Sequence, residues 1–110
     1  MKPKIEPAWS YISDFDDADS INAALVNELK KELAPDHQLF GCTATAIARA
    51  NPNDDVLFKL EGGRAAIVHL TWKGSSERTP WPATTIFTSL DEAMKSVLTD
   101  VAVWLKNEEE

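Results

Sequence analysis

The chain has 110 residues, is 44% hydrophobic and 26% charged, and carries a formal net charge of -7. This size and composition are typical of a single folded domain, residues 1–110, whose core is large enough to need no metal or disulfide. With Cys42 as its one cysteine, the sequence excludes an internal disulfide and favours a cytoplasmic location. No basic stripe is present to neutralise phosphates, so we expect neither nucleic acid nor an anionic membrane as partner.

The first residues lack the continuous apolar run of a signal peptide, and no apolar stretch is long enough to span a bilayer. The acidic groups concentrate toward the two ends of the sequence. Residues 1–20 hold five acidic and two basic groups, and residues 89–110 hold six and two. Acidic surfaces speed the capture of basic partners. We therefore expect a basic protein as partner, and the acidic face comprises Asp14, Asp16, Asp17, Asp91, Glu92 and Asp100.

Large apolar side chains at residues 9–15 predict either a short helix over 8–14 or an arm packed onto the body. A helix is predicted over residues 21–34, with Asp19 or Ser20 as its cap and Pro35 as its end. Its apolar stripe comprises Ile21, Leu25, Val26, Leu29 and Leu33.

Alternating alanine and threonine predict a strand over residues 41–49, although a helix is the main alternative for so alanine-rich a segment. Residues 55–72 predict a β-hairpin around Gly62-Gly63, because glycine adopts the positive φ of a tight turn. A two-residue turn there would pair Leu60 with Ala65 and Val56 with His69. A loop over 73–83 then leads to a strand over 84–88.

The last helix begins with a capping box, in which Ser89 and Glu92 bond each other's backbone N–H groups. We expect Leu98, Val101 and Leu105 to be buried against the sheet. The whole apolar face comprises Leu90, Met94, Val97, Leu98, Val101, Trp104 and Leu105. The predicted fold is α+β: an antiparallel four-stranded sheet, a meander plus one strand, covered by an N-terminal and a C-terminal helix.

Four segments in the middle of the chain are distinctive: residues 37–41, 54–58 (DDVLF), 68–74 (VHLTWKG) and 80–84 (PWPAT). On these segments, residues 36–90 resemble a family of small uncharacterised bacterial proteins. Relatives read His-Pro-Leu where this chain has His37-Gln38-Leu39, a departure that weakens any special role for His37. The resemblance implies no activity, cofactor or partner.

His69 is a weak candidate for catalysis, because a histidine near neutrality can act as acid, base or ligand. Asp54 or Asp55 could reach it across the hairpin and orient its imidazole. The alternative is a histidine that packs against Trp72 and bonds a loop backbone. That alternative is the more common arrangement, since carboxylates lie near histidines by chance.

Other chemistry is disfavoured by the sequence. Cys42 sits among small residues, where cysteine commonly acts as a small hydrophobe, so we do not expect a nucleophile. Asp17, Asp19 and Glu28 have a calcium-loop spacing, but Ile21 and Asn22 occupy positions that need an oxygen ligand and a glycine. We therefore expect no metal site and no cofactor.

The loop from Trp72 to Trp81 is a binding candidate, because two tryptophans and Arg78 are residue types enriched at interface hot spots. The alternative is that both indoles close one end of the core. The sequence thus favours a small acidic protein that binds another macromolecule stoichiometrically, for example as an immunity protein or inhibitor. The alternative is a small enzyme or ligand-binding protein with a pocket around His69, Trp72 and Trp81. The oligomeric state stays open.

Overall fold

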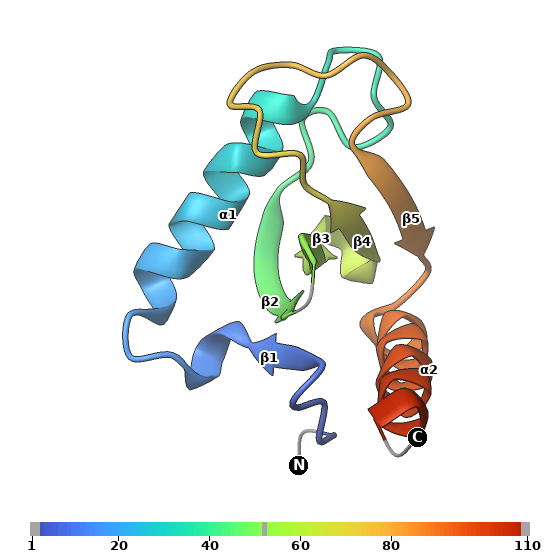
Figure 1. Cartoon of the computed structure of the whole chain (residues 1–110). Helices are drawn as coiled ribbons and strands as arrows, with labels where there is room; N and C mark the ends of the chain where they lie inside the picture. The colour runs from blue at the N-terminus through green and yellow to red at the C-terminus, as the bar shows by residue number, and fades with distance from the viewer. Residues whose placement is uncertain (1–2, 52, 109–110) are drawn as a thin grey trace.

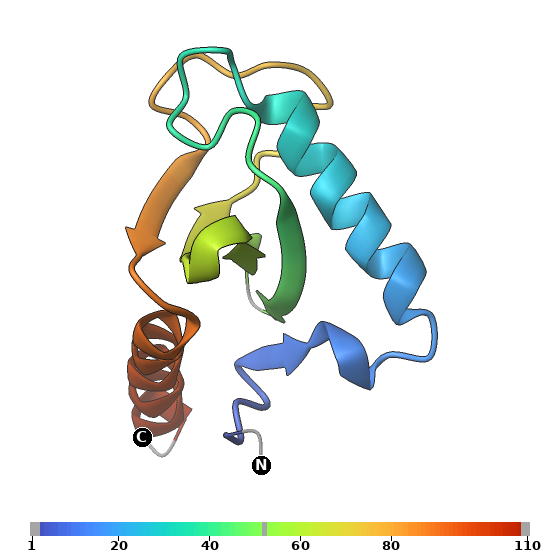
Figure 2. The same ribbon diagram turned by 180° about the vertical axis from the view of Figure 1, so that it is seen from behind.

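The computed structural model, which describes residues 3–51 and 53–108, is an α+β fold with one antiparallel sheet in strand order β1-β2-β3-β4-β5. One long helix packs on each side of the sheet (Figure 1, Figure 2). Neither helix, over the described residues, is long and apolar enough to cross a membrane. The strands are β1 (Trp9–Tyr11), β2 (Ala44–Ala50), β3 (Asp55–Leu60), β4 (Ala65–His69) and β5 (Ala83–Phe87), and the helices are α1 (Ala18–Glu32) and α2 (Leu90–Glu108).

The N-terminal segment is an arm packed onto the body, as one of the two predictions had it. It does not form a helix over 8–14; β1 is followed by a single 3-10 turn, η1 (Ile12–Asp14). Because β1 pairs with Ala48–Ala50 of β2, the predicted four-stranded sheet gains a fifth strand. Ile5 and Trp9 are buried in the cluster on the α2 side of the sheet.

Helix α1 covers one face with the stripe predicted for it. Leu25, Leu29 and Leu33 are buried against residues of β3 and β4. The helix begins three residues earlier than predicted, with Asp17 as its N-cap residue. The prediction of Asp19 or Ser20 as the cap is therefore wrong, because both lie inside the first turn.

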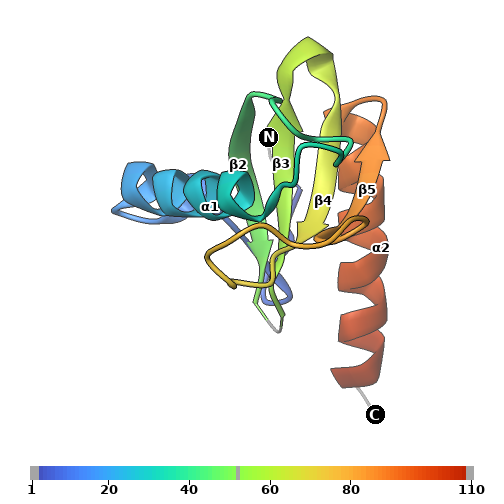
Figure 3. The ribbon, with the colours of Figure 1, turned by 90° about the horizontal axis from the view of Figure 1, so that it is seen from above.

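Helix α2 covers the opposite face and begins at the predicted cap, where Ser89 Oγ accepts the backbone N–H of Glu92 at 3.1 Å. The second bond of the predicted capping box is replaced, because the Glu92 carboxylate accepts a hydrogen bond from Lys95 Nζ. Among its described side chains, the buried ones are Ala93, Val97 and Val101, which are spaced by one helical turn. Leu98 and Leu105 are 37% and 42% exposed, so their predicted burial is wrong. Leu98 lies off the line through the buried positions, and the C-terminal turns of α2 extend past β4 and β5 (Figure 3). The side chain of Trp104 lies outside the described residues.

The predicted hairpin forms, and both its glycines have positive φ, 78° at Gly62 and 83° at Gly63. The turn is a three-residue 3-10 turn, η2 (Glu61–Gly63), rather than the predicted two-residue turn. The predicted register is consequently wrong by one residue: Val56 pairs with Val68, and Asp55 pairs with His69. A shift of one residue changes which side chains meet across the ladder.

Strand β2 confirms the strand prediction over the helical alternative, and its outer side is only partly covered. Its register with β3 shifts between Ala46 and Ala48, which makes Ile47 the extra residue of a bulge. β1 pairs with β2 from Ala48 to Ala50, and η1 then turns away. Residues 44–47 are therefore an edge of the sheet, although the same strand is internal from Ala48 onward.

Candidate functional site

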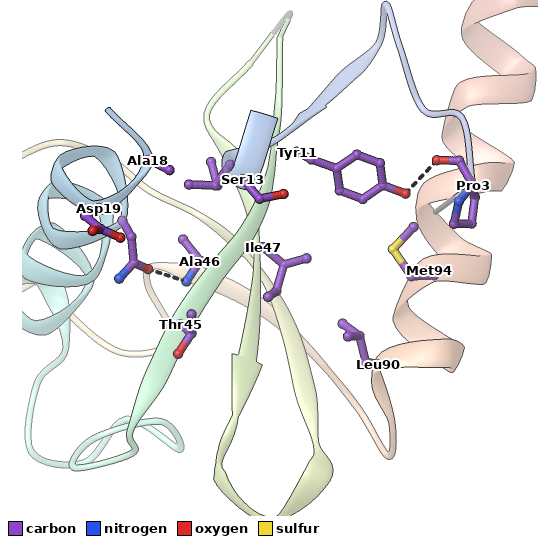
Figure 4. Close-up of a pocket in the computed structure, with 12 residues that line it drawn as sticks. Pro3, Tyr11, Ser13, Ala18, Asp19, Thr45, Ala46, Ile47, Leu90 and Met94 are labelled. Atoms are coloured by element: carbon purple, nitrogen blue, oxygen red, sulfur yellow. Dashed lines mark hydrogen bonds between the residues drawn. The ribbon is translucent and has the colours of Figure 1, made fainter. Parts of the chain in front are cut away.

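An open groove of about 530 Å³ lies along this edge of β2, with α1 on one side and α2 on the other (Figure 4). Its volume falls in the range of small-ligand sites in proteins. The lining residues come from the N-terminal arm, η1, both helices and β2: Pro3, Tyr11, Ile12, Ser13, Ala18, Asp19, Asn22, Thr45, Ala46, Ile47, Leu90 and Met94.

Hydrogen bonds between distant segments fix the walls of the groove. The Tyr11 hydroxyl donates to the carbonyl of Pro3 at 2.6 Å, which holds the arm beside α2 (Figure 4). Asn22 Oδ1 of α1 accepts the backbone N–H of Ala46 at 2.7 Å, which ties the first turns of α1 to β2. The groove is therefore held open by contacts on both sides.

The floor of the groove is apolar and its borders are acidic. Ile47, Leu90 and Met94 are half-buried there, and the exposed Asp19 lines the α1 side. Asp91, the residue after Leu90, is exposed on the α2 side. Asp16 and Asp17 are exposed just before α1. The lysines closest in sequence to the groove-lining residues are Lys4, which follows Pro3, and Lys95, which follows Met94. Lys95 Nζ bonds Glu92 Oε1 at 3.1 Å. Such a groove favours ligands that combine apolar and basic groups.

The acidic residues predicted to form one face lie on different sides of α2. Asp91 is exposed and follows the groove residue Leu90, whereas the Glu92 carboxylate bonds Lys95 Nζ. Asp100 lies on another flank of the helix, where its Oδ2 accepts the indole N–H of Trp9 at 2.7 Å. Asp100 there lines a smaller pocket of about 180 Å³, together with Asp55 and other residues. Asp100 can thus add to the long-range field but not to contacts in the groove.

A buried carboxyl pair, which the sequence analysis missed, holds the loop between β4 and β5. Glu32 is 0% exposed, and its two side-chain oxygens accept the backbone N–H groups of Thr71 and Trp72, both at 2.9 Å. Glu28, one helical turn earlier and 6% exposed, accepts the N–H of Gly74 at 3.0 Å. Together the two carboxyl groups fix the start of the loop to α1.

Burial, together with a hydrogen bond to Glu28, raises the pKa of Glu32 to about 7. The pKa of Glu28 is lowered, first by that same hydrogen bond. The proton shared by the pair therefore resides on Glu32, and Glu28 is the carboxylate. One buried charge in place of two reduces the desolvation cost of the pair.

His37 and Asp36, just beyond α1, hold the end of the same loop. His37 is buried, and its Nδ1 accepts the N–H of Leu39 at 3.0 Å. Its Nε2 is consequently the donor to the Pro82 carbonyl at 3.2 Å. The Thr79 hydroxyl donates to Asp36 Oδ1 at 2.6 Å. His37 thus has a structural role in joining two loops.

The loop between β4 and β5 carries the binding candidates Trp72, Arg78 and Trp81 at the surface. Trp72 is 48% and Trp81 52% exposed, and Arg78 is exposed as well. Trp72 has φ 57°, a left-handed conformation that is uncommon outside glycine. Half-exposed indoles favour the binding interpretation over closure of the core. The loop lies at the end of the molecule away from α2 (Figure 1), so it is a surface separate from the groove.

His69 meets Asp55, one of the two carboxylates proposed for it. The Nδ1 and Oδ1 atoms are 2.8 Å apart, and the side chains are 49% and 31% exposed. This bond would leave Nε2 of His69 for proton transfer. Cys42 packs on the α1 side, near the hairpin tip, where Arg64 Nη2 is 3.9 Å from its Sγ. His69 is at the other end of the hairpin, so the two do not form a catalytic pair.

Two further observations bear on chemistry at these sites. Among the described side chains, no three His, Cys, Asp or Glu residues are grouped so that they could hold a metal ion. Comparison of the chain with protein-family models, with curated proteins and with solved structures found no match. The resemblance to a bacterial family therefore stays a prediction.

Proposed function

We propose that the protein acts stoichiometrically by binding a basic segment of another protein in the groove along β2. The observation that carries this proposal is the groove itself, which has a volume of about 530 Å³ and an apolar floor. The exposed Asp19 of α1 lines it, and the exposed Asp91 of α2 follows the groove residue Leu90 in sequence. An immunity or inhibitor role, in which the basic surface of a toxin or nuclease is masked, is one form of such binding.

Exposed apolar side chains extend the groove along α2. Leu98 follows Met94 by four residues, so it lies one turn further on the same side of the helix. It is 37% exposed, and Leu105 is 42% exposed two turns beyond it. A protein partner could cover this stripe together with the groove. Apolar surface provides affinity, while the acidic borders direct the approach of a basic partner.

A second candidate function is enzymatic or small-ligand chemistry near His69, and the Asp55–His69 hydrogen bond favours it. Both side chains are substantially exposed, and His69 does not line the groove. Exposed ion pairs of this kind contribute little to stability, so the pair is free to serve chemistry without cost to the fold. This candidate predicts that His69→Ala abolishes a measurable turnover while the fold survives.

The proposal is tested in two steps. A photo-crosslinking amino acid in place of Thr45, an exposed residue of the groove, identifies the bound partner in extract of the source cells, and the same amino acid at Glu61 on the hairpin tip is the control. Association with the purified partner is then measured at increasing salt. We expect one-to-one binding whose on-rate falls with salt, because the attraction is long-range.

Charge reversal distinguishes capture by the groove from a general field effect. Asp16→Lys with Asp91→Lys should lower the on-rate roughly 10-fold at low salt and change the dissociation rate less. Glu61→Lys, a single charge reversal away from the groove, should have less than half of this effect. His69→Ala should leave binding unchanged. An association rate that ignores salt and the reversals would contradict the proposal.

A further inference from the structure

The backbone of β2 directs hydrogen-bonding groups away from β3 and toward the groove. The Thr43 carbonyl accepts the N–H of Glu61 and so points toward the hairpin, whereas the N–H of Ala46 points away from β3 to Asn22. Polar groups of a strand alternate in direction along the chain. The N–H and C=O groups of Ala44 and Ala46 therefore face outward, in the plane where a further strand would pair.

Cavities lie along this edge. The groove is lined by Thr45, Ala46 and Ile47, and a second cavity of about 360 Å³ is lined by Thr43 and Ala44. One cavity thus opens at each end of the edge, and the Asn22 side chain lies between them at the Ala46 N–H. Phe40, beside the second cavity, is 53% exposed.

The charges along the edge define a polarity. Asp19 lines the groove together with Ile47, whereas Lys30 lines the second cavity together with Ala44. A strand that continues the line of β1 would be antiparallel to β2, as β1 is. Its N-terminal part would then lie near Asp19, and its C-terminal part would lie near Lys30.

Resting on the proposed function, we infer that the partner segment binds by strand addition. An extended segment, basic in its N-terminal half and acidic at its C-terminal end, pairs antiparallel with residues 43–47 of β2. Backbone hydrogen bonds to Ala44 and Ala46 give affinity, and side chains in the two cavities give specificity. Because this is a pairing of backbones, it distinguishes the partner from a helix or a small molecule bound in the same groove.

In the unbound protein, the Asn22 side chain blocks strand pairing at this edge. It occupies the Ala46 N–H, and capping an edge in this way discourages unwanted pairing. A bound strand must displace it. Asn22→Ala should therefore tighten the dissociation constant roughly 2- to 10-fold, the factor that one net hydrogen bond supplies. Asn27→Ala, an exposed site on the same helix, is the matched control and should change nothing.

The test uses a synthetic probe, the capped heptapeptide Lys-Val-Lys-Val-Thr-Val-Glu, titrated into isotope-labelled protein at low salt. We expect amide shifts at residues 43–47 and hydrogen exchange at Ala44 slowed about 10-fold at about 90% occupancy. The amides of β5, the opposite edge strand, are the internal control. The same peptide with N-methyl groups on two consecutive central residues, which blocks both of its edges, should not bind, and the reversed sequence should bind more weakly.

Each outcome decides the inference. Peptide binding with protection of Ala44, loss on N-methylation and tightening in Asn22→Ala supports strand addition. Shifts in the groove without protection, or equal binding of the N-methylated peptide, would overturn strand addition while the proposed function stands. Absence of any binding at millimolar peptide would also overturn it, and the photo-crosslinked partner would then decide the proposed function separately.

Discussion

Glu32→Gln should remove a pH dependence of stability that the buried carboxyl pair imposes. Burial and the hydrogen bond with Glu28 raise the pKa of Glu32 from 4.5 to about 7, so the folded state holds this proton more tightly than the unfolded chain does. The resulting stabilisation is fully present below pH 4.5 and is lost as the pH rises through about 7. A shift of this size corresponds to roughly 3 kcal/mol when fully developed.

Glu28 contributes to the pH dependence of stability with the opposite sign. Its lowered pKa gives stability that is present above pH 4.5 and is lost at lower pH. The window from pH 4.5 to about 8 therefore reports chiefly on Glu32. The glutamine of Glu32→Gln keeps one acceptor for the loop N–H groups and loses the other, which costs about 1–3 kcal/mol at low pH. That deficit should shrink as the pH rises, because only the wild-type protein then acquires a second buried charge.

Urea unfolding of the wild-type and Glu32→Gln proteins, repeated at several pH values in this window, gives the free energy of unfolding of each protein as a function of pH. The test compares these two curves. Glu92→Gln, an exposed position on α2, is the control and should run parallel to the wild type. Parallel curves for the wild type and Glu32→Gln would refute the reasoning, because they would show that Glu32 does not bind its proton more tightly in the folded state.

Other predictions concern the core, the turn and the two surfaces. Val97→Ala should lower the free energy of unfolding by roughly 1–3 kcal/mol, because Val97 is 0% exposed, whereas Leu98→Ala should lower it by less than about 1 kcal/mol. Equal urea midpoints for the two variants would contradict the packing of α2. Gly62→Val should destabilise by roughly 1–3 kcal/mol, because φ is 78° there, and an unchanged melting temperature would argue against the turn. Asp16→Lys with Asp91→Lys should slow partner association about 10-fold in stopped-flow measurements, with Glu61→Lys nearly inert. Asn22→Ala should tighten binding of the heptapeptide in calorimetry. A dissociation constant equal to that of Asn27→Ala would show that Asn22 does not block strand pairing.

Local patterns predicted the elements that depend on local periodicity. The stripe of Leu25, Leu29 and Leu33, the cap at Ser89 and the glycine turn all rest on spacings within a few residues, and all three formed. The register of the hairpin was not predictable in this way. A turn of two or three residues fits the same Gly-Gly pair, and apolar residues lie on both faces of β3, so alternation could not decide between them.

The candidate site depends on contacts between distant segments, which explains why the sequence did not reveal it. The groove joins residues from the arm, both helices and β2, and none of these segments carries a binding motif of its own. The carboxyl pair did leave a signal. Glu28 and Glu32 are spaced by four residues and lie next to Leu25, Leu29 and Leu33 on the helix, so they fall on its buried face. The same argument from spacing would have placed Leu98 beside the buried line of α2.

The most direct test of the central claim is the association rate of the photo-crosslinked partner, measured by stopped flow against salt concentration. Capture by the acidic groove predicts a rate that falls with salt, drops about 10-fold in the Asp16→Lys, Asp91→Lys protein and is nearly unchanged in Glu61→Lys and His69→Ala. A rate that is independent of salt and equal in all of these proteins would contradict the account.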